Sequence, residues 1–177
     1  MFLLKVQKSD PTVHVKYAVV NFGKVVGESD TRYTRDIMET WTCFTDGGAR
    51  GNPGPSGIGV VVLNPKGEVA GEFNSYLGNG TNNYAEYAAV VLALTELKKM
   101  LGKKTKSVAV HIKLDSELVQ KQLSGIYQIK EISLIPQFIE IHNLRVANFP
   151  KLTFEHIPRA KNKEADRLAN EAMDRGN

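Results

Sequence analysis

The stretch FTDGGARGNPGP, residues 44–55, joins an aspartate to a run of small and turn-forming residues. We predict that Asp46 ends a strand and opens a glycine-rich turn that continues through Gly47 and Gly48. Because glycine has no side chain, the backbone of such a turn can approach a ligand closely. The stretch therefore places one carboxylate within reach of a sugar or a phosphate.

From Trp41 onwards the sequence alternates between strand and helix patterns. Runs rich in apolar and β-branched residues predict strands over residues 42–45, 57–63, 68–76, 108–114 and 152–157. A turn over residues 78–82 precedes a long alanine-rich helix, and further helices are predicted over residues 116–123, 135–147 and 162–173. Short turns make the first three strands an antiparallel meander. The later alternation of strands and helices predicts parallel pairing, so the fold class is α/β.

Residues 1–40 have a different character and are interpreted as an extension to a domain over residues 41–177. Alternating apolar residues on both sides of a glycine turn predict a hairpin over residues 13–26. The polar residues 28–39 favour a linker or a short helix. An exposed linker of mixed charge is preferred there over a nucleic-acid contact through Arg32, Tyr33 and Arg35.

The composition is that of a globular domain with a basic surface. Of the 177 residues, 42% are hydrophobic and 24% are charged, and 23 Lys and Arg against 19 Asp and Glu give a formal charge of +4. This balance permits a polyanionic partner. The only cysteine, Cys43, lies in an apolar run and is expected to be a buried, inert thiol in a reducing compartment. Neither a signal peptide nor a membrane span is expected, so we expect a cytoplasmic protein without a membrane partner.

Three further acidic residues share the setting of Asp46. Asp115 ends an apolar strand, Glu86 is placed in the first turn of the long helix, and Asp166 lies near the start of the last helix. Carboxylates that are packed together raise one another's pKa unless cations neutralise them. Mg²⁺ prefers such oxygen ligands, and two ions about 3.5 to 4 Å apart can assist phosphodiester hydrolysis. The alternative is that each acid only forms a turn or interacts with a helix dipole.

Four segments together resemble the catalytic blocks of the type 1 ribonuclease H family, in the same order and with fitting separations. They are FTDGGARGNPGPSGIGVVV, TNNYAEYAAVVLAL, KLDSELV and HIPRAKNKEADRLANEA, and the resemblance covers roughly residues 41–173. The resemblance implies a ribonuclease H-like fold, with a five-stranded mixed sheet flanked by helices. It also implies metal-dependent cleavage of the RNA strand of an RNA/DNA hybrid.

The resemblance assigns both metal binding and catalysis to Asp46, Glu86, Asp115 and Asp166, with two Mg²⁺ ions per site and Mn²⁺ as a substitute. Asp46 would bridge the two ions, Asp166 would complete the water-activating side, and the other two acids would complete the leaving-group side. The products would carry 5′-phosphate and 3′-hydroxyl ends. The hybrid would be contacted by Gly47, Gly48, Asn52, Thr81, Asn82 and Asn83. Helix capping is an alternative for Thr81 and Asn82, and the two roles are compatible.

The sequence departs from the family pattern in two places. Many members have a histidine in the loop before the last helix, whereas His156 is interpreted here as a strand residue. Arg159 or Lys161 could approach the scissile region instead, and a solvated loop charge is an equal alternative for both. The segment over residues 124–136 also lacks a long basic protrusion. Tyr127 and Lys130 are candidates for hybrid binding, as is a lysine group for which a solvated helix end is preferred. This group comprises Lys98, Lys99, Lys103, Lys104 and Lys106.

The sequence thus predicts a metal-dependent ribonuclease H that acts on RNA/DNA hybrids. A related nuclease with broader substrates, including double-stranded RNA, is one alternative. A non-catalytic hybrid-binding module is the other, although an unused carboxylate cluster would destabilise the fold.

Overall fold

The structure of the protein, a computed structural model, describes residues 12–21, 24–34 and 38–176, with side chains from residue 38 onwards. The chain divides into two compact units, residues 1–37 and residues 38–177. Each is described by itself. None of the helices in the described ranges is long and apolar enough to cross a membrane.

The first unit contains an antiparallel pair of strands, β1 (Thr12–Asn21) and β2 (Lys24–Thr34). Thr12 lies opposite Thr34, and the register shifts after Val19. The linker or short helix expected over residues 28–39 is wrong for residues 28–34, because each of these has a partner in β1. The proposed contact through Arg32, Tyr33 and Arg35 concerns side chains outside the described part of the structure.

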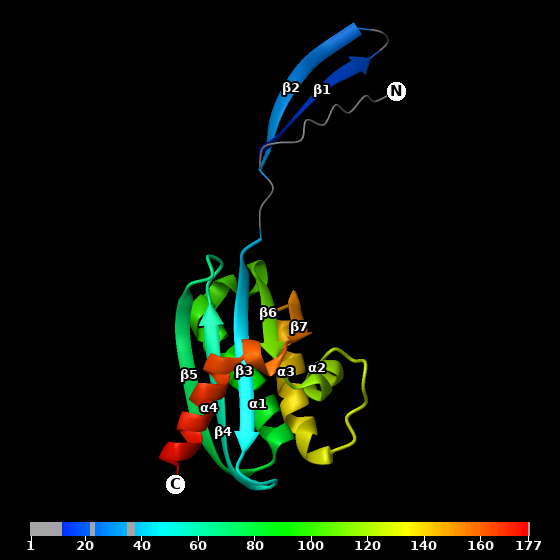
Figure 1. The fold of residues 1–177 in the computed structure, drawn as a ribbon. Helices are drawn as coiled ribbons and strands as arrows, with labels where there is room; N and C mark the ends of the chain where they lie inside the picture. The colour runs from blue at the N-terminus through cyan, green and yellow to red at the C-terminus, as the bar shows by residue number, and fades with distance from the viewer. Residues whose placement is uncertain (1–11, 22–23, 35–37, 177) are drawn as a thin grey trace. The chain divides into compact units, whose positions relative to one another are not determined.

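The second unit is a five-stranded mixed sheet in the order β5-β4-β3-β6-β7 (Figure 1). Its strands are β3 (Thr40–Ala49), β4 (Gly54–Leu63), β5 (Val69–Gly80), β6 (Ala109–Leu114) and β7 (Leu152–His156). The pairs β3–β4 and β4–β5 are antiparallel, whereas β3–β6 and β6–β7 are parallel. The predicted antiparallel meander followed by two parallel strands is thereby confirmed.

Helices cover both faces of this sheet (Figure 1). The helices are α1 (Asn82–Leu101), α2 (Glu117–Leu123), α3 (Ile135–Ala147) and α4 (Lys163–Arg175), with short 3-10 turns over residues 102–107, 132–134 and 159–161. The helix α1 lies behind β3 and β4 in the view of Figure 1, and α4 crosses the front of β4 and β5. The helices predicted over residues 116–123, 135–147 and 162–173 are found within two residues of their predicted ends, and the long alanine-rich helix is α1.

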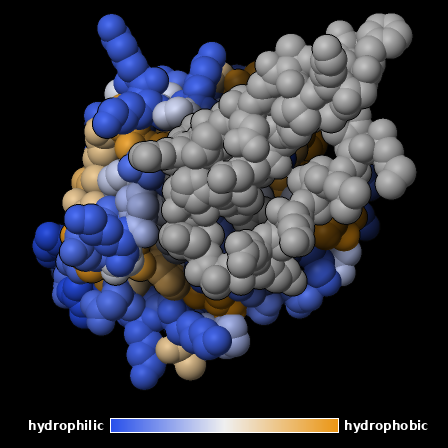
Figure 2. Space-filling view, turned by 90° about the horizontal axis from the view of Figure 1, so that it is seen from above, coloured by the Kyte–Doolittle hydropathy of each residue, from blue (hydrophilic) through white to orange (hydrophobic). Residues whose placement is uncertain are grey.

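The main hydrophobic core lies between α1 and the sheet. Alternate residues of β3 and β4, such as Cys43, Val60 and Val62, point into it and meet Val90 and Leu94 of α1. Cys43 is buried as expected, and burial raises the pKa of its thiol to about 12. Hydrophilic side chains project from much of the visible surface in Figure 2, with smaller hydrophobic areas between them.

Three predicted boundaries are wrong near the glycine-rich stretch. Asp46 does not end its strand, because β3 continues to Ala49 and pairs with β4 as far as Ser56. The turn expected over residues 78–82 is shorter, since β5 runs on to Gly80. Glu86 lies in the second turn of α1, which begins at Asn82. In the first two cases the pairing of β4 with its neighbours extends the strands beyond their apolar cores.

Candidate active site

Two of the predicted acids are brought together by strand register. The parallel pairing of β3 with β6 ends where Thr45 lies opposite Leu114. The next residues are Asp46 and Asp115, so their carboxylates lie side by side just where β6 ends. Because β3 continues beyond this point, Asp46 is held by β4, opposite Gly59, and is only 7% exposed.

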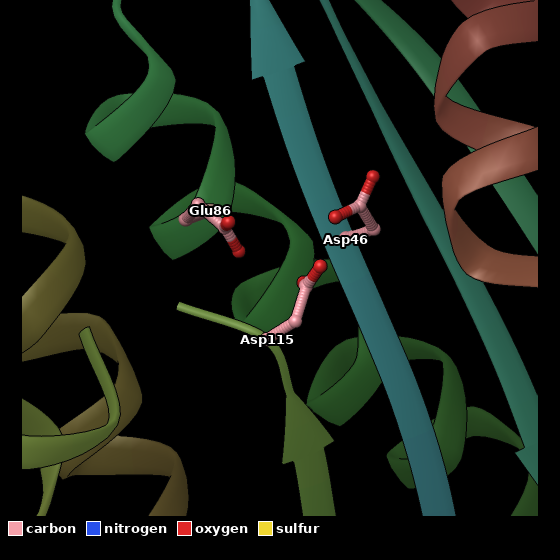
Figure 3. Close-up of side chains that lie close together, drawn as sticks. All are labelled: Asp46, Glu86 and Asp115. Atoms are coloured by element: carbon pink, nitrogen blue, oxygen red, sulfur yellow. The ribbon is translucent and has the colours of Figure 1, made fainter. Parts of the chain in front are cut away.

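The third acid comes from α1, which approaches β3 with no side chain in between. A Cβ atom on Gly47 would lie 2.2 Å from the backbone carbonyl carbon of Ala85 and 2.4 Å from the backbone nitrogen of Glu86. The absence of this atom lets the helix contact the strand and brings Glu86 beside Asp46. Figure 3 shows the carboxylates of Asp46, Glu86 and Asp115 turned toward one another, each carried by a different element.

One carboxylate oxygen from each of these three residues lies within 4.8 Å of the other two. Desolvation by burial, followed by the charge of Asp115, raises the pKa of Asp46 to about 7. Burial and the charge of Asp46 also raise the pKa of Glu86 well above its ordinary value. The Oε2 atom of Glu86 is buried and has no hydrogen-bond partner within the described residues. Buried carboxylates this close together are stabilised when a cation neutralises them, so the three acids form a candidate metal site.

The fourth predicted acid, Asp166, lies in the first turn of α4, outside this close group. Its Oδ1 atom accepts a hydrogen bond of 2.5 Å from Nη2 of Arg159, with which it forms an ion pair. The charge of Asp166 still contributes to the raised pKa of Asp46, and that of Arg159 opposes it. Asp166 and Arg159 both line the cleft that contains the other acids.

This cleft has a volume of about 580 Å³ and a mostly polar lining. It contains all four acids and several predicted hybrid contacts, namely Gly47, Gly48, Asn82 and Asn83, together with Ala49, Arg50, Ser116, Arg159, Asn170 and Met173. Gly48 is open to it, since a Cβ there would meet only the end of Met173 at 3.8 Å. Backbone and amide groups therefore lie on the same wall as the carboxylates.

The other two predicted hybrid contacts, Thr81 and Asn52, form hydrogen bonds next to this wall of the cleft. Thr81 caps α1, and its Oγ1 accepts a hydrogen bond of 3.2 Å from the backbone N–H of Tyr84. The Oδ1 atom of Asn52 accepts one of 3.2 Å from the backbone N–H of Asn82. The Oδ1 atom of Asn82 in turn accepts one of 2.8 Å from the backbone N–H of Ala49. These bonds tie the glycine-rich loop to the start of α1.

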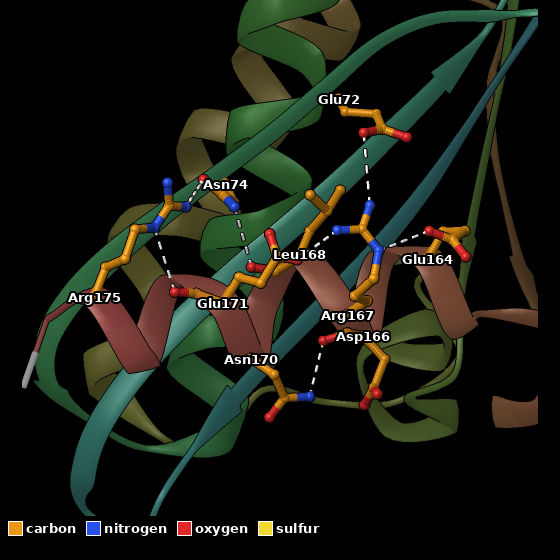
Figure 4. A network of polar contacts seen from close by, with 9 residues as sticks. All are labelled: Glu72, Asn74, Glu164, Asp166, Arg167, Leu168, Asn170, Glu171 and Arg175. Carbon is orange, nitrogen blue, oxygen red and sulfur yellow. Dashed lines mark hydrogen bonds and ion pairs between the residues drawn. The ribbon is translucent and has the colours of Figure 1, made fainter.

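The helix that carries Asp166 is fixed to the sheet in two ways. A Cβ on Gly59 would lie 2.1 Å from the carbonyl oxygen of Ala165, so α4 contacts β4 backbone to backbone. On its outer side Arg167 reaches three carboxylates, those of Glu72 on β5 and of Glu164 and Glu171 on α4 (Figure 4). The groups in this network are about half exposed.

Of the other residues that the sequence offered as candidates, some line the cleft and others do not. His156 is the last residue of β7, as the sequence indicated, and it is not among the residues that line the cleft. Of the two loop cations, Arg159 lines the cleft and Lys161 does not. Tyr127 and Lys130 line a second hollow of about 520 Å³ that shares Asn83 with the cleft. Lys98 lies twelve residues beyond Glu86 along α1, about 18 Å away at about 1.5 Å per residue.

Sequence reasoning missed one residue beside the acids. Asn162 precedes α4 and is 1% exposed, and its Nδ2 donates to Oδ1 of Asp115 at 3.0 Å and to the carbonyl oxygen of Thr45 at 2.9 Å. The signal was present in the sequence as an asparagine four residues before Asp166. Such a residue indicates a helix cap, but its side chain makes no capping bond here.

Comparison with known proteins extends this description. Residues 44–172 match a family described as reverse transcriptase-like. The "Bifunctional protein Rv2228c" of Mycobacterium tuberculosis is 40% identical over 130 residues, which are 73% of this chain and 34% of that protein. The "Ribonuclease HI" of Halobacterium salinarum is 37% identical over 131 residues, which are 74% of this chain and 63% of that protein. The chain thus spans about a third of the length of the first relative and less than two thirds of the second.

Among solved structures, a crystal structure of LC11-RNase H1 in complex with an RNA/DNA hybrid superposes with a TM-score of 0.74. It is 46% identical to this chain, and the match covers 77% of this chain and 98% of that one. The five-stranded sheet and its helices are therefore shared with a solved structure over nearly the whole of the second unit.

Proposed function

This chain belongs to the reverse transcriptase-like family and within it to the type 1 ribonucleases H, and we propose that it is a metal-dependent endoribonuclease acting on RNA/DNA hybrids. The observation that carries the proposal is the cluster of Asp46, Glu86 and Asp115, whose oxygens lie within 4.8 Å of one another in an open polar cleft. The relative whose structure contains a hybrid supports the choice of substrate.

The residues of the cluster fit a hard divalent cation. All three offer carboxylate oxygens, which Mg²⁺ and Mn²⁺ prefer, and the buried Oε2 of Glu86 has no other partner in the described chain. Asp166 stands at the rim of the same cleft and is included as the fourth ligand. When bound, two such ions would supply an activated water on one side of the phosphodiester and a stabilised leaving oxygen on the other.

The chain's own residues position the substrate and the charges. Asp46 and Asp115 are fixed by strand register, and Glu86 is fixed by the contact of α1 with Gly47. The guanidinium of Arg159 reaches the cleft and supplies a positive charge where the sequence has no loop histidine. Hydrolysis on the proposed pathway leaves a 5′-phosphate and a 3′-hydroxyl, and no covalent bond to the protein forms.

We place the RNA strand along the wall formed by Gly47, Gly48, Asn82 and Asn83. The backbone at Gly48 is open to the cleft and can contact a 2′-hydroxyl, the group that distinguishes RNA from DNA. The second hollow, with Tyr127 and Lys130, adjoins this wall at Asn83 and is assigned to the other strand. Asn52 and Thr81 then act indirectly, by holding the loop and the helix start.

We extend the proposal to a cytoplasmic location, which is supported by the single buried cysteine. The positive formal charge of the chain also supports a nucleic-acid partner.

The proposal is tested by cleavage of a labelled RNA/DNA hybrid, an RNA duplex and a DNA duplex with Mg²⁺, Mn²⁺ or EDTA. We expect the RNA strand of the hybrid to be cut with either metal and no cutting with EDTA. Asp46→Asn and Glu86→Gln should each lower the rate by more than about 100-fold, because each removes a ligand charge. Glu96→Gln is the matched control, since Glu96 lies ten residues beyond Glu86 along α1 and pairs with Lys99.

Cutting in EDTA, or full activity in Asp46→Asn, would show that the acidic cluster is not a catalytic metal site. Equal cutting of the RNA duplex would favour the nuclease of broader substrates. Binding of the hybrid without cutting in either metal would favour the non-catalytic module.

A further inference from the structure

The amide of Asn162 joins three parts of the second unit. The residue lies at the start of α4, and its Nδ2 donates to the backbone of β3 at Thr45 and to the carboxylate of Asp115 beyond β6. Thr45 immediately precedes Asp46 of the acidic cluster, and Asp115 is itself a member of the cluster. The residue itself is 1% exposed, so these bonds are shielded from water.

The orientation of this amide is fixed by its acceptors. A rotation by 180° would turn Oδ1 toward two other oxygens, the carbonyl of Thr45 and the carboxylate of Asp115, and would lose both bonds. In the observed orientation Oδ1 is buried and has no partner among the described residues. An unpaired buried oxygen of this kind is unfavourable for stability. The amide of Asn162 therefore contributes to the structure only through its N–H groups.

We propose that Asn162 is a positioning residue of the metal site, which sets the Asp115 carboxylate at the distance from Asp46 that a shared cation requires. The inference rests on the proposed function. Asn162 is not among the residues that line the cleft and acts through Asp115. Groups that orient a metal-binding carboxylate contribute to metal affinity, and their loss weakens binding by about 10-fold or more.

The test measures Mn²⁺ binding to the full chain by the loss of the electron paramagnetic resonance signal of free Mn²⁺. In Asn162→Leu, the side chain keeps the same number and branching of heavy atoms and the unpaired oxygen is removed, so we expect a folded protein. Its Kd for Mn²⁺ should rise by about 10-fold. Cleavage of the hybrid should also fall, and higher Mn²⁺ concentrations should restore it in part. Asn162→Ala provides a second variant if the leucine does not fit.

Two controls separate positioning from a general structural role. Gln122→Leu also removes a buried amide, one that bonds to Tyr87 and to the carbonyl of Gln128, and it should leave the Kd for Mn²⁺ unchanged. In an Asp115→Asn background, Asn162→Leu should change the Kd by less than about twofold, since residues that act as one unit are not additive.

Each outcome decides between the two proposals. If the wild-type protein binds no Mn²⁺, the proposed function itself fails. If it binds Mn²⁺ and a folded Asn162 variant binds equally well, only the positioning role is wrong. The positioning role is also wrong if neither Asn162 variant folds, or if the effect persists unchanged in the Asp115→Asn background.

Discussion

At the scale of single residues, the acidic cluster combines charges that repel one another with burial that disfavours charge. The raised pKa of Asp46 and of Glu86 records both effects. Arg159 offsets them only partly, because its guanidinium is largely exposed and pairs with Asp166. The metal-free protein therefore carries an electrostatic penalty that grows as the carboxyl groups lose their protons.

This penalty predicts how the stability of the metal-free protein depends on pH. The pKa of Asp46 is about 7 when folded and 3.8 when unfolded, so the folded state holds a proton longer. The stabilising contribution of the protonated group is present below about pH 4 and is lost as the pH rises to about 7. In EDTA, the unfolding free energy of the wild type should therefore fall relative to that of Asp46→Asn over this range. A few kcal/mol are expected, at about 1.4 kcal/mol per pH unit.

Urea denaturation at pH 5, 6, 7 and 8 measures this difference, and subtracting the variant cancels the titration of groups outside the acidic cluster. A difference that stays constant with pH would contradict the raised pKa. Added Mg²⁺ should remove most of the difference at pH 8, because the cation neutralises the cluster.

The residues of the site could be predicted only in part from the sequence. The four acids stood out because each follows a strand or begins a helix. Asn162 did not, because an asparagine before a helix is usually a cap and its real partners, Thr45 and Asp115, are distant in the sequence. Nor could the pairing of Asp166 with Arg159 be foreseen, since it depends on how the loop before α4 folds.

At the scale of elements, the two long helices reach the sheet through glycines. Because Gly47 has no side chain, α1 contacts the backbone of β3, and because Gly59 has none, α4 contacts the backbone of β4. The two helices lie on opposite faces of these neighbouring strands. The sequence suggested Gly47 as part of a turn that approaches a ligand and placed Gly59 inside a predicted strand. Their packing role could not be predicted, because it depends on which face of β3 or β4 each helix covers.

Substitution of two adjacent glycines tests this difference. Gly47→Ala should destabilise the fold by about 1–3 kcal/mol or more, because its Cβ would overlap the backbone of α1. It should also weaken Mn²⁺ binding, since α1 carries Glu86. Gly48→Ala is the matched control and should change stability by less than about 1 kcal/mol, with only Met173 near the new atom. Guanidinium denaturation of both variants measures the effect, and equal stabilities would refute it.

The ion-pair network on α4 is expected to contribute much less. Arg167 pairs with Glu72, Glu164 and Glu171 at 3.6, 2.9 and 2.5 Å, but all of these side chains are 43% to 65% exposed. Arg167→Gln should therefore lower the unfolding free energy by no more than about 1 kcal/mol, and less in high salt. A loss of several kcal/mol in thermal or denaturant unfolding would show that the network, and not the contact at Gly59, holds the helix.

At the scale of the whole molecule, the order of strands and helices was predictable because each segment from Trp41 onwards has a clear apolar period. The extent of β3 and β5 was not, since it is set by pairing with β4 beyond the apolar residues. The first unit was harder to predict, because the strand β2 includes the polar residues 28–34 and is specified by its partner.

We propose that the second unit folds without the first. A chain of residues 38–177 keeps all five strands of the sheet, including the bond from Ala109 N–H to the carbonyl of Glu39. Its unfolding midpoint in calorimetry should match that of the main transition of the full chain to within a few degrees. Failure of this piece to fold, or loss of its Mn²⁺ binding, would show that residues 1–37 belong to the catalytic domain.

The strand β3 pairs antiparallel with β4 on one side and parallel with β6 on the other. Asp46 lies on β3, and Asp115 follows β6 directly beside it. If β6 slipped by one residue along β3, Asp115 would move by about 3.3 Å and its side chain would turn to the other face. A cation held between Asp46 and Asp115 would oppose such a slip. The ion that we propose for catalysis would then also favour the native strand register, because mispaired forms of the sheet could not bind it.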